Sequence, residues 1–256
     1  MPTCAICERS VAAWLAHPYY HGGNEFIQSL GAVGSDLEYH GCPNCGADDL
    51  ERHAWLYLSA QVGARWLRGK GVLHIGATQD FEAGLAVCLR RSGPAEYQVF
   101  DLVRGAASGG PAEGRQADAT TLSDSPELPY ANGSFDLIIC NQQLHRVCDA
   151  AQTLAEFARC LVPDGLLLVQ TLYAPKLKNT LEWVDTVPDA MAAILFADAG
   201  GKRLFGGDVA AYFHRAGFAG ELRPHAAILP GHEGPEYGCN PLEPLFLFTK
   251  MPTTTP

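Results

Sequence analysis

A chain of 256 residues is long enough for one large domain, or for one domain with a small appendage. Its 28 acidic and 18 basic side chains give a net charge of −10, which counts against nucleic acid as a partner, because cations supply most of the affinity for phosphate. No apolar run approaches the roughly 18 residues of a membrane span, and the segment from Met1 to Cys4 does not resemble a signal peptide. We therefore expect a cytoplasmic protein that does not enter a membrane, and the sequence leaves its oligomeric state open.

Two Cys-x-x-Cys motifs near the N-terminus predict a metal site. In a reducing compartment the nine cysteines are expected to be metal ligands or buried thiols rather than disulfides. The two motifs are formed by Cys4 with Cys7 and by Cys42 with Cys45, and four thiolates on two tight turns complete the usual tetrahedral site of a structural zinc ion. The linker between them contains His17, His21 and His40, any of which could replace a cysteine. We assign residues 1–50 to this zinc ribbon module.

A helix and a nucleotide-binding half-domain follow. Apolar residues recur at helical spacing from Glu51 to Leu67, and Val72–Ile75 is typical of a buried strand. Gly76 begins a tight turn, a helical pattern follows it, and a second strand ends on Asp101. A carboxylate at that position can accept hydrogen bonds from both hydroxyl groups of a ribose. Gly76 is the single glycine of a loop that usually carries two or three.

The middle of the chain continues the alternation of strands and helices. Residues 116–122 predict a short strand beside Asp118, whose carboxylate could accept a hydrogen bond from an adenine amino group or could cap a helix. Residues 135–140 and 166–170 fit buried parallel strands, with an amphipathic helix at residues 151–160 between them and a turn at residues 163–165.

The C-terminal part differs from that of a dinucleotide-binding dehydrogenase. A helix is expected over residues 208–216, followed by two strand-like pieces at residues 221–229 and 245–249. These pieces predict an antiparallel hairpin that closes a parallel sheet. His225 falls on a peripheral element in this interpretation.

With these pieces in order, the sequence resembles the class I S-adenosylmethionine-dependent methyltransferases over about residues 50–250. A narrower bacterial group with an N-terminal four-cysteine ribbon is similar over almost the whole chain, because the second Cys-x-x-Cys motif runs into Glu51-Arg52-His53. The resemblance implies a Rossmann-like, seven-stranded α/β sheet in residues 51–256, S-adenosylmethionine as cofactor and a structural zinc ion. The segments that carry it are residues 72–76, Asp101, Asp118-Ala119, residues 128–138, residues 161–165 and Ala216-Gly217-Phe218.

The same resemblance implies roles for individual residues in cofactor binding. Asp101 would hold the ribose hydroxyls, and Asn141 would close the site near the methionine end. Asp118 and Ala119 would flank the adenine. The residues that would lie against the methionine and ribose portion are His74, Ile75, Gly76, Ala77 and Thr78.

The sequence departs from the family on the side where a substrate would bind. Residues 77–79 replace further glycines of the first loop, residues 142–146 differ from the narrower group, and a polar segment after Phe205-Gly206 is missing. These departures indicate a retained cofactor pocket with a rebuilt substrate side.

Two residues are candidates for catalysis. His145 follows the strand at residues 135–140, where a base could act, and an unperturbed imidazole suits proton transfer at neutral pH. The alternative is a histidine packed in a helical turn that donates to a backbone carbonyl. Tyr173, beyond the next strand, is the second candidate.

Three functional hypotheses follow. The first is a methyltransferase that acts on a small molecule, in specialised metabolism. The second is an enzyme of this fold with a non-methylating reaction, such as an intramolecular cyclisation with S-adenosylhomocysteine as leaving group. The third is a non-catalytic cofactor-binding or scaffold protein. An RNA substrate is disfavoured, because Arg9 is the only Lys or Arg before Arg52.

Overall fold

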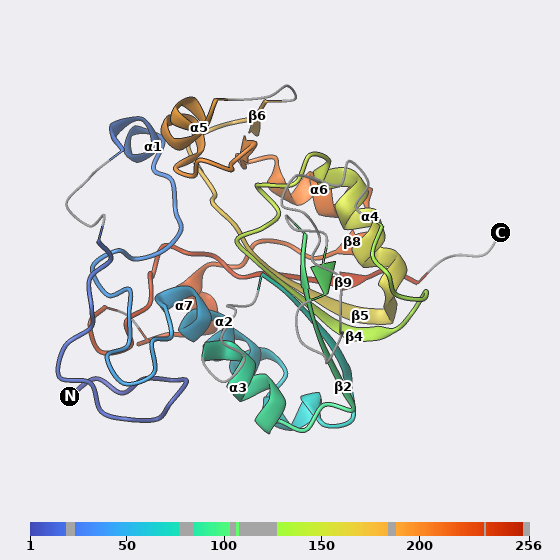
Figure 1. Cartoon of the computed structure of the whole chain (residues 1–256), viewed down its shortest axis with the longest axis horizontal. Helices are drawn as coiled ribbons and strands as arrows, with labels where there is room; N and C mark the ends of the chain where they lie inside the picture. Colours follow the sequence, from blue (N-terminus) through green and yellow to red (C-terminus); the bar gives the residue numbers. More distant parts are fainter. Residues whose placement is uncertain are drawn as a thin grey trace.

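A seven-stranded sheet forms the centre of the protein (Figure 1). The computed structural model describes residues 1–18, 24–76, 84–102, 106–107, 127–183, 188–232 and 234–252. The strand order is β3-β2-β1-β4-β5-β9-β8, with β2, β1, β4 and β5 parallel to one another and β9 antiparallel to both of its neighbours. The strands are β1 (Gly71–Ile75), β2 (Glu96–Asp101), β3 (Ala106–Ala107), β4 (Phe135–Asn141), β5 (Leu161–Gln170), β8 (Phe218–Ala219) and β9 (Phe246–Lys250). This arrangement confirms the predicted α/β fold.

The strand predicted over residues 221–229 is wrong. The strand before β9 is the short β8, and residues 225–228 form the helix α7 instead. Pro224 begins this helix, and its fixed φ suits the first turn. Residues 221–229 have the mixed polarity that is also typical of a half-buried strand, which explains the wrong prediction. Arg223 forms a strand-like contact, an isolated antiparallel bridge with Leu245. The predicted turn at residues 163–165 also lies within β5, where Asp164 adopts a positive φ of 61°.

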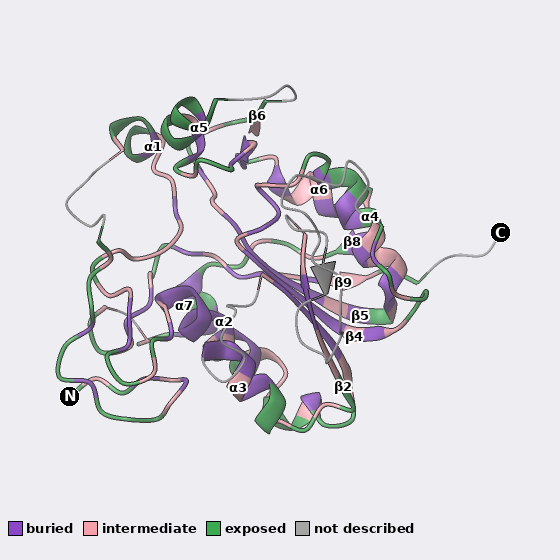
Figure 2. Ribbon diagram, viewed as in Figure 1, coloured by how far each residue is buried: buried purple, intermediate pink, exposed green. Residues whose placement is uncertain are grey.

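Helices cover both faces of the sheet, and most residues of its central strands are buried (Figures 1 and 2). Val72 packs with α2, α3 and α7, whereas the next residue, Leu73, packs with α4 and α6 on the opposite face. Two continuous hydrophobic layers result. The helices are α1 (Glu25–Ser29), α2 (Asp49–Gln61), α3 (Gly84–Arg91), α4 (Ala150–Cys160), α5 (Asp189–Phe196), α6 (Val209–Arg215) and α7 (His225–Ile228), with a 3-10 turn at Ala64–Leu67.

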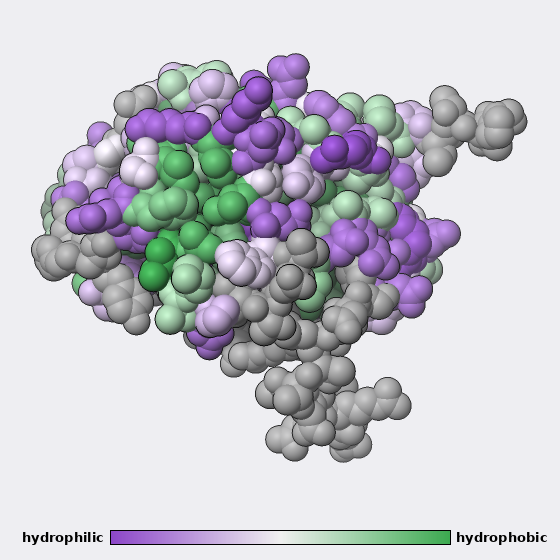
Figure 3. Space-filling model, turned by 90° about the horizontal axis from the view of Figure 1, so that it is seen from above, coloured by the Kyte–Doolittle hydropathy of each residue, from purple (hydrophilic) through white to green (hydrophobic). Residues whose placement is uncertain are grey.

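A small cap lies at one end of the molecule. It contains α1, α5 and the antiparallel strands β6 (Leu181–Glu182) and β7 (Arg203–Leu204), and Phe196 is at its hydrophobic centre. Apolar side chains gather on the surface of this region (Figure 3). Phe26, Met191 and Ile194 are exposed there. The described residues include no helix with the length and apolarity needed to cross a bilayer.

Arg52 joins the N-terminal segment to the C-terminal loop. Its guanidinium is fully buried, lies 4.1 Å from the ring of Trp14, and donates to the carbonyl oxygens of His40, Ala47 and Gly238 at 2.7–3.2 Å. A planar guanidinium can donate to several carbonyl groups at once, which suits it to a place where three segments of the chain meet.

The domain boundary after residue 50 stays a prediction.

Candidate active site and thiol cluster

The order of the sheet reverses at β1, which has β2 on one side and β4 on the other. In open α/β sheets, the crevice at the carboxyl ends of such strands is where ligands bind. Gly76, Asp101 and Asn141 lie at the ends of these three strands. The sheet topology therefore brings together three of the residues that the family resemblance implied.

Gly76 is required by close backbone packing. Its φ is 75°, and a Cβ atom there would lie 2.2 Å from the carbonyl oxygen of Asn141. No side chain fits at that distance, so β1 can leave the sheet beside β4 only through a glycine. The Gly76 amide donates to the carbonyl of Phe100 at 3.2 Å, which ties β1 to β2 at the same level.

The His74 side chain supports the site from beneath. The ring is fully buried, its Nδ1 lies 2.8 Å from the hydroxyl oxygen of Tyr97, and its Nε2 lies 3.4 Å from Nδ2 of Asn141. Burial lowers the pKa of His74 to about 3, so the imidazole is neutral at pH 7 and can accept from the Asn141 amide. The Ile75 side chain is also buried, in the layer under α4 and α6. At these two positions, only the backbone is available to a ligand.

The remaining predicted cofactor residues lie outside the described residues. They are Ala77, Thr78, Asp118 and Ala119.

Several buried polar atoms at the ends of β4 and β5 have no hydrogen-bond partner among the residues that the structure describes. They are Asn141 Oδ1, His145 Nδ1, Gln170 Oε1 and Thr171 Oγ1. Leaving such an atom unpaired costs about 1–3 kcal/mol, so their concentration at one edge of the sheet is typical of a site that binds a polar ligand or water.

His145 is held by an acidic residue that the sequence did not reveal. Its Nε2 lies 3.0 Å from Oδ2 of Asp198, and the ring is 4% exposed. Burial raises the pKa of Asp198, but the hydrogen bond from His145 and the charge of Arg146 outweigh it and hold the pKa at about 2. Asp198 is therefore a carboxylate that accepts the Nε2 proton. An imidazole whose proton is on Nε2 presents a lone pair at Nδ1, which is the arrangement that a general base requires.

Tyr173 contributes to packing in this structure. Its backbone pairs with Val33 and Phe205, and its ring meets Phe246 edge-on at a centroid distance of 5.8 Å. Burial raises the pKa of its hydroxyl group. Within the described residues, no hydrogen bond or ring contact joins Tyr173 to His145, so its catalytic role stays a prediction.

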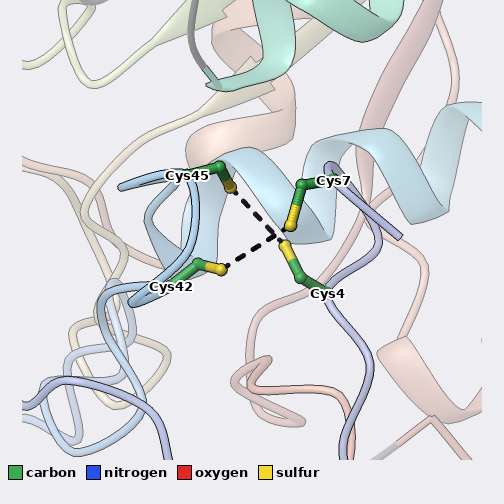
Figure 4. A group of neighbouring side chains, drawn as sticks. All are labelled: Cys4, Cys7, Cys42 and Cys45. Carbon is green, nitrogen blue, oxygen red and sulfur yellow. Dashed lines mark hydrogen bonds between the residues drawn. The ribbon is translucent and has the colours of Figure 1, made fainter. Parts of the chain in front are cut away.

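The four N-terminal cysteines of the predicted metal site converge (Figure 4). Their sulfur atoms all lie within 4.8 Å of one another, and the Cys4–Cys45 and Cys7–Cys42 pairs are each 3.9 Å apart. A tetrahedral zinc ion with Zn–S bonds of about 2.3 Å requires S···S separations of about 3.8 Å. The thiol cluster thus fits zinc. His40 instead lies 3.0 Å from Oδ1 of Asp49, and His21 lies outside the described residues.

A second buried polar chain was missed by the sequence interpretation. His53 on α2 places Nδ1 2.7 Å from Oε2 of Glu243 and Nε2 2.7 Å from Nδ1 of His225. Gln170 donates to the other oxygen of Glu243 at 3.2 Å. His225 is 1% exposed, so it is a buried structural residue of the short helix α7 and not an exposed one. Residues this far apart in sequence carry no spacing signal that could have joined them.

Comparison with known proteins agrees with this architecture. Residues 82–169, roughly a third of the chain, match the family model described as a methyltransferase domain. The matched segment runs from the helix after the first loop to β5 and includes Asp101, Asn141 and His145. The comparison with curated proteins gives no match.

Solved structures of low sequence identity are similar to this chain. An S-adenosylmethionine-dependent methyltransferase from Mesorhizobium loti is 17% identical, with 74% of this chain and 98% of that chain covered and a TM-score of 0.42. A protein from Bacillus halodurans, provisionally described as a methyltransferase, is 19% identical, with 67% and 68% covered and a TM-score of 0.41. A Listeria monocytogenes protein with a similar provisional description is 12% identical, with 80% and 99% covered and a TM-score of 0.44. None of these TM-scores reaches 0.5, so no functional argument is drawn from the three structures.

Proposed function

We propose that the protein is an S-adenosylmethionine-dependent methyltransferase that acts on a small molecule. The methyltransferase-domain match over residues 82–169 carries the proposal. The chemistry of the strand ends supports it. A carboxylate ends β2 and a tight glycine turn follows β1. At the ends of β4 and β5 lie buried polar atoms that have no partner among the described residues.

In this proposal, His145 is the general base. The cofactor supplies an electrophilic methyl group, and the protein orients the acceptor and removes its proton. Asp198 accepts the Nε2 proton of His145 and so fixes the tautomer whose Nδ1 lone pair is available. Arg146 contacts the same carboxylate, at 2.8 Å from Oδ2, and holds it in place. Asn141 offers Oδ1 as an acceptor for a ligand donor group, since its Nδ2 is turned toward His74.

A small acceptor suits the charge of the chain. The net charge of −10 opposes a polyanionic substrate, and the small cap with α5 is appended beside the carboxyl edge of the sheet that carries His145. A role in specialised metabolism is part of the proposal and rests on the unusual residues 142–146.

A structural zinc ion in the thiol cluster belongs to the same proposal. Cys4, Cys7, Cys42 and Cys45 would hold it, and four protein ligands leave no position open for a reacting molecule. The ion would stabilise the N-terminal segment against α2 and α3 and would take no part in methyl transfer.

The test is incubation with methyl-labelled S-adenosylmethionine and a panel of small hydroxyl, amine and thiol acceptors. Label in a product, together with S-adenosylhomocysteine, is the expected result. Tight binding of S-adenosylhomocysteine with no labelled product from any acceptor would favour a non-methylating reaction. Absence of cofactor binding in calorimetry would contradict the proposal.

A further inference from the structure

Gln143 lies where the ends of three strands meet. It is the second residue after β4, and it is 7% exposed. Its Cγ is 3.0 Å from the point where a side chain on Gly76 would begin. Its amide reaches the end of β2, where it contacts both Asp101 and Leu102. One side chain therefore spans the crevice floor from β4 to β2.

The orientation of the Gln143 amide is determined by its two partners. Oε1 accepts the backbone N–H of Leu102 at 2.7 Å, and Nε2 donates to Oδ1 of Asp101 at 3.2 Å. A flipped amide would set its NH₂ group against the Leu102 N–H and its oxygen against the carboxylate. Both contacts would then be repulsive, so only the observed orientation is compatible with the surroundings.

This contact restricts the carboxylate of Asp101, which would hold the ribose hydroxyls if the protein binds S-adenosylmethionine as proposed. An aspartate at a strand end rotates about two bonds, and recognition of two adjacent hydroxyl groups requires one particular rotation. A hydrogen bond to a charged acceptor is stronger than one between neutral groups. Because Gln143 is itself buried and fixed, its hydrogen bond limits the rotation of the Asp101 side chain before any ligand binds. Less conformational entropy of that side chain is then lost on binding.

We propose that Gln143 is a positioning residue that presets the orientation of Asp101 for a ligand with a vicinal diol. The inference rests on the proposed cofactor function, because Asp101 acts there on the ribose. Gln143 acts through Asp101 and not on the ligand itself. Its effect on ligand affinity should therefore depend on the presence of the aspartate.

A double-mutant cycle tests this dependence with S-adenosylhomocysteine as the calorimetric probe. The variants are Gln143→Met, Asp101→Ala and the double variant, with thermal unfolding measured for each. Gln143→Met keeps the length of the side chain and removes its hydrogen bonds. We expect it to weaken binding about tenfold in the parent, as a charge-assisted hydrogen bond would, and less than twofold in the Asp101→Ala background. Equal losses in the two backgrounds would overturn the inference, because they would show a general structural effect.

Gln143→Glu gives a second, pH-dependent readout. It places a carboxylate against Asp101, so affinity should fall more than in Gln143→Met at pH 8 and should partly recover near pH 5, where a proton can be shared. Gln152→Glu makes the same change on the exposed first turn of α4 and should leave binding unaltered. A Gln143→Glu affinity that does not vary with pH would contradict the inference. Failure of the parent to bind the probe would instead refute the proposed function.

Discussion

Asp198 changes what His145 can do. A histidine after a central strand is equally compatible with packing and with catalysis when only the sequence is known. The structure adds an ionised carboxylate beside Nε2, and Nδ1 has no hydrogen-bond partner in the described part of the chain. His145 lies in the turn after β4 and Asp198 lies in the loop after α5, so no local pattern could have connected them.

Replacement of His145 should separate chemistry from cofactor binding. His145→Gln keeps a polar side chain but cannot accept a proton, and we expect the methyl-transfer rate to fall by about 10²–10⁴ with unchanged affinity for S-adenosylmethionine. Asp198→Asn should lower the rate less, through loss of the tautomer preference. Rates with the acceptor found in the labelled screen provide the measurement. His214→Gln alters an exposed histidine and serves as the control. An unchanged rate in His145→Gln would remove it from the mechanism.

At the scale of the elements, the first turn of α2 connects three parts of the protein. Glu51 accepts the backbone N–H of Leu85 at the start of α3, Arg52 binds carbonyls of the N-terminal and C-terminal segments, and His53 pairs with Glu243. The sequence identified Glu51-Arg52-His53 as a recognisable segment. Most of its contacts could not be inferred, because its side-chain partners other than Ala47 and Asp48 are distant along the chain.

Removal of the Arg52 guanidinium should destabilise the whole chain. Arg52→Met retains most of the volume but leaves several buried carbonyl oxygens without a donor. At about 1–3 kcal/mol for each unsatisfied group, we expect a loss of about 3 kcal/mol or more in the free energy of unfolding. Urea unfolding followed by circular dichroism gives this quantity. Arg65→Met, at an exposed position, is the matched control and should change it by less than about 0.5 kcal/mol. Equal stability of the two variants would contradict the role of Arg52.

The thiol cluster should bind one zinc ion per chain. Metal analysis of the purified protein is expected to show it, and Cys42→Ser should remove it and lower the unfolding temperature, because metal binding and folding of such sites are coupled. Cys148→Ser changes an exposed cysteine outside the cluster and should do neither. Retention of full zinc in Cys42→Ser would show that the ion binds elsewhere.

For the molecule as a whole, most of the sheet could be predicted and the end of the chain could not. Strands β1, β2, β4, β5 and β9 could be placed from their apolar residues and the turns that bound them, and the seven-stranded sheet was expected from the family resemblance. The helix α7 was mistaken for a strand because four residues are too few to show a helical period. The cap and the His53–Glu243 pair depend on contacts between distant segments, which periodicity does not report.

Stability of the whole chain should depend on pH through its buried neutral histidines. The pKa of His74 is lowered to about 3 and that of His225 to about 4, in both cases first by burial, against about 6.5 in an unfolded chain. Below pH 6.5 the unfolded state therefore binds more protons than the folded state does. The free energy of unfolding should fall as the pH drops from 6.5 toward 4, by up to about 1.4 kcal/mol per pH unit for each histidine.

Urea titrations at several pH values measure this slope. His74→Gln removes one of the two groups and should reduce the slope between pH 6 and pH 4.5, with the contribution of His225 retained. A slope that is identical in the parent and in His74→Gln would mean that His74 does not remain neutral in the folded protein.

The most direct test of the central claim is calorimetric titration of the parent protein and of Asp101→Ala with S-adenosylmethionine. The account predicts binding of one molecule per chain and an affinity at least about tenfold lower in Asp101→Ala, as expected when a carboxylate loses its hydrogen bonds to the ligand. No binding by the folded parent, or equal binding by both proteins, would contradict a cofactor site at the ends of β1, β2 and β4.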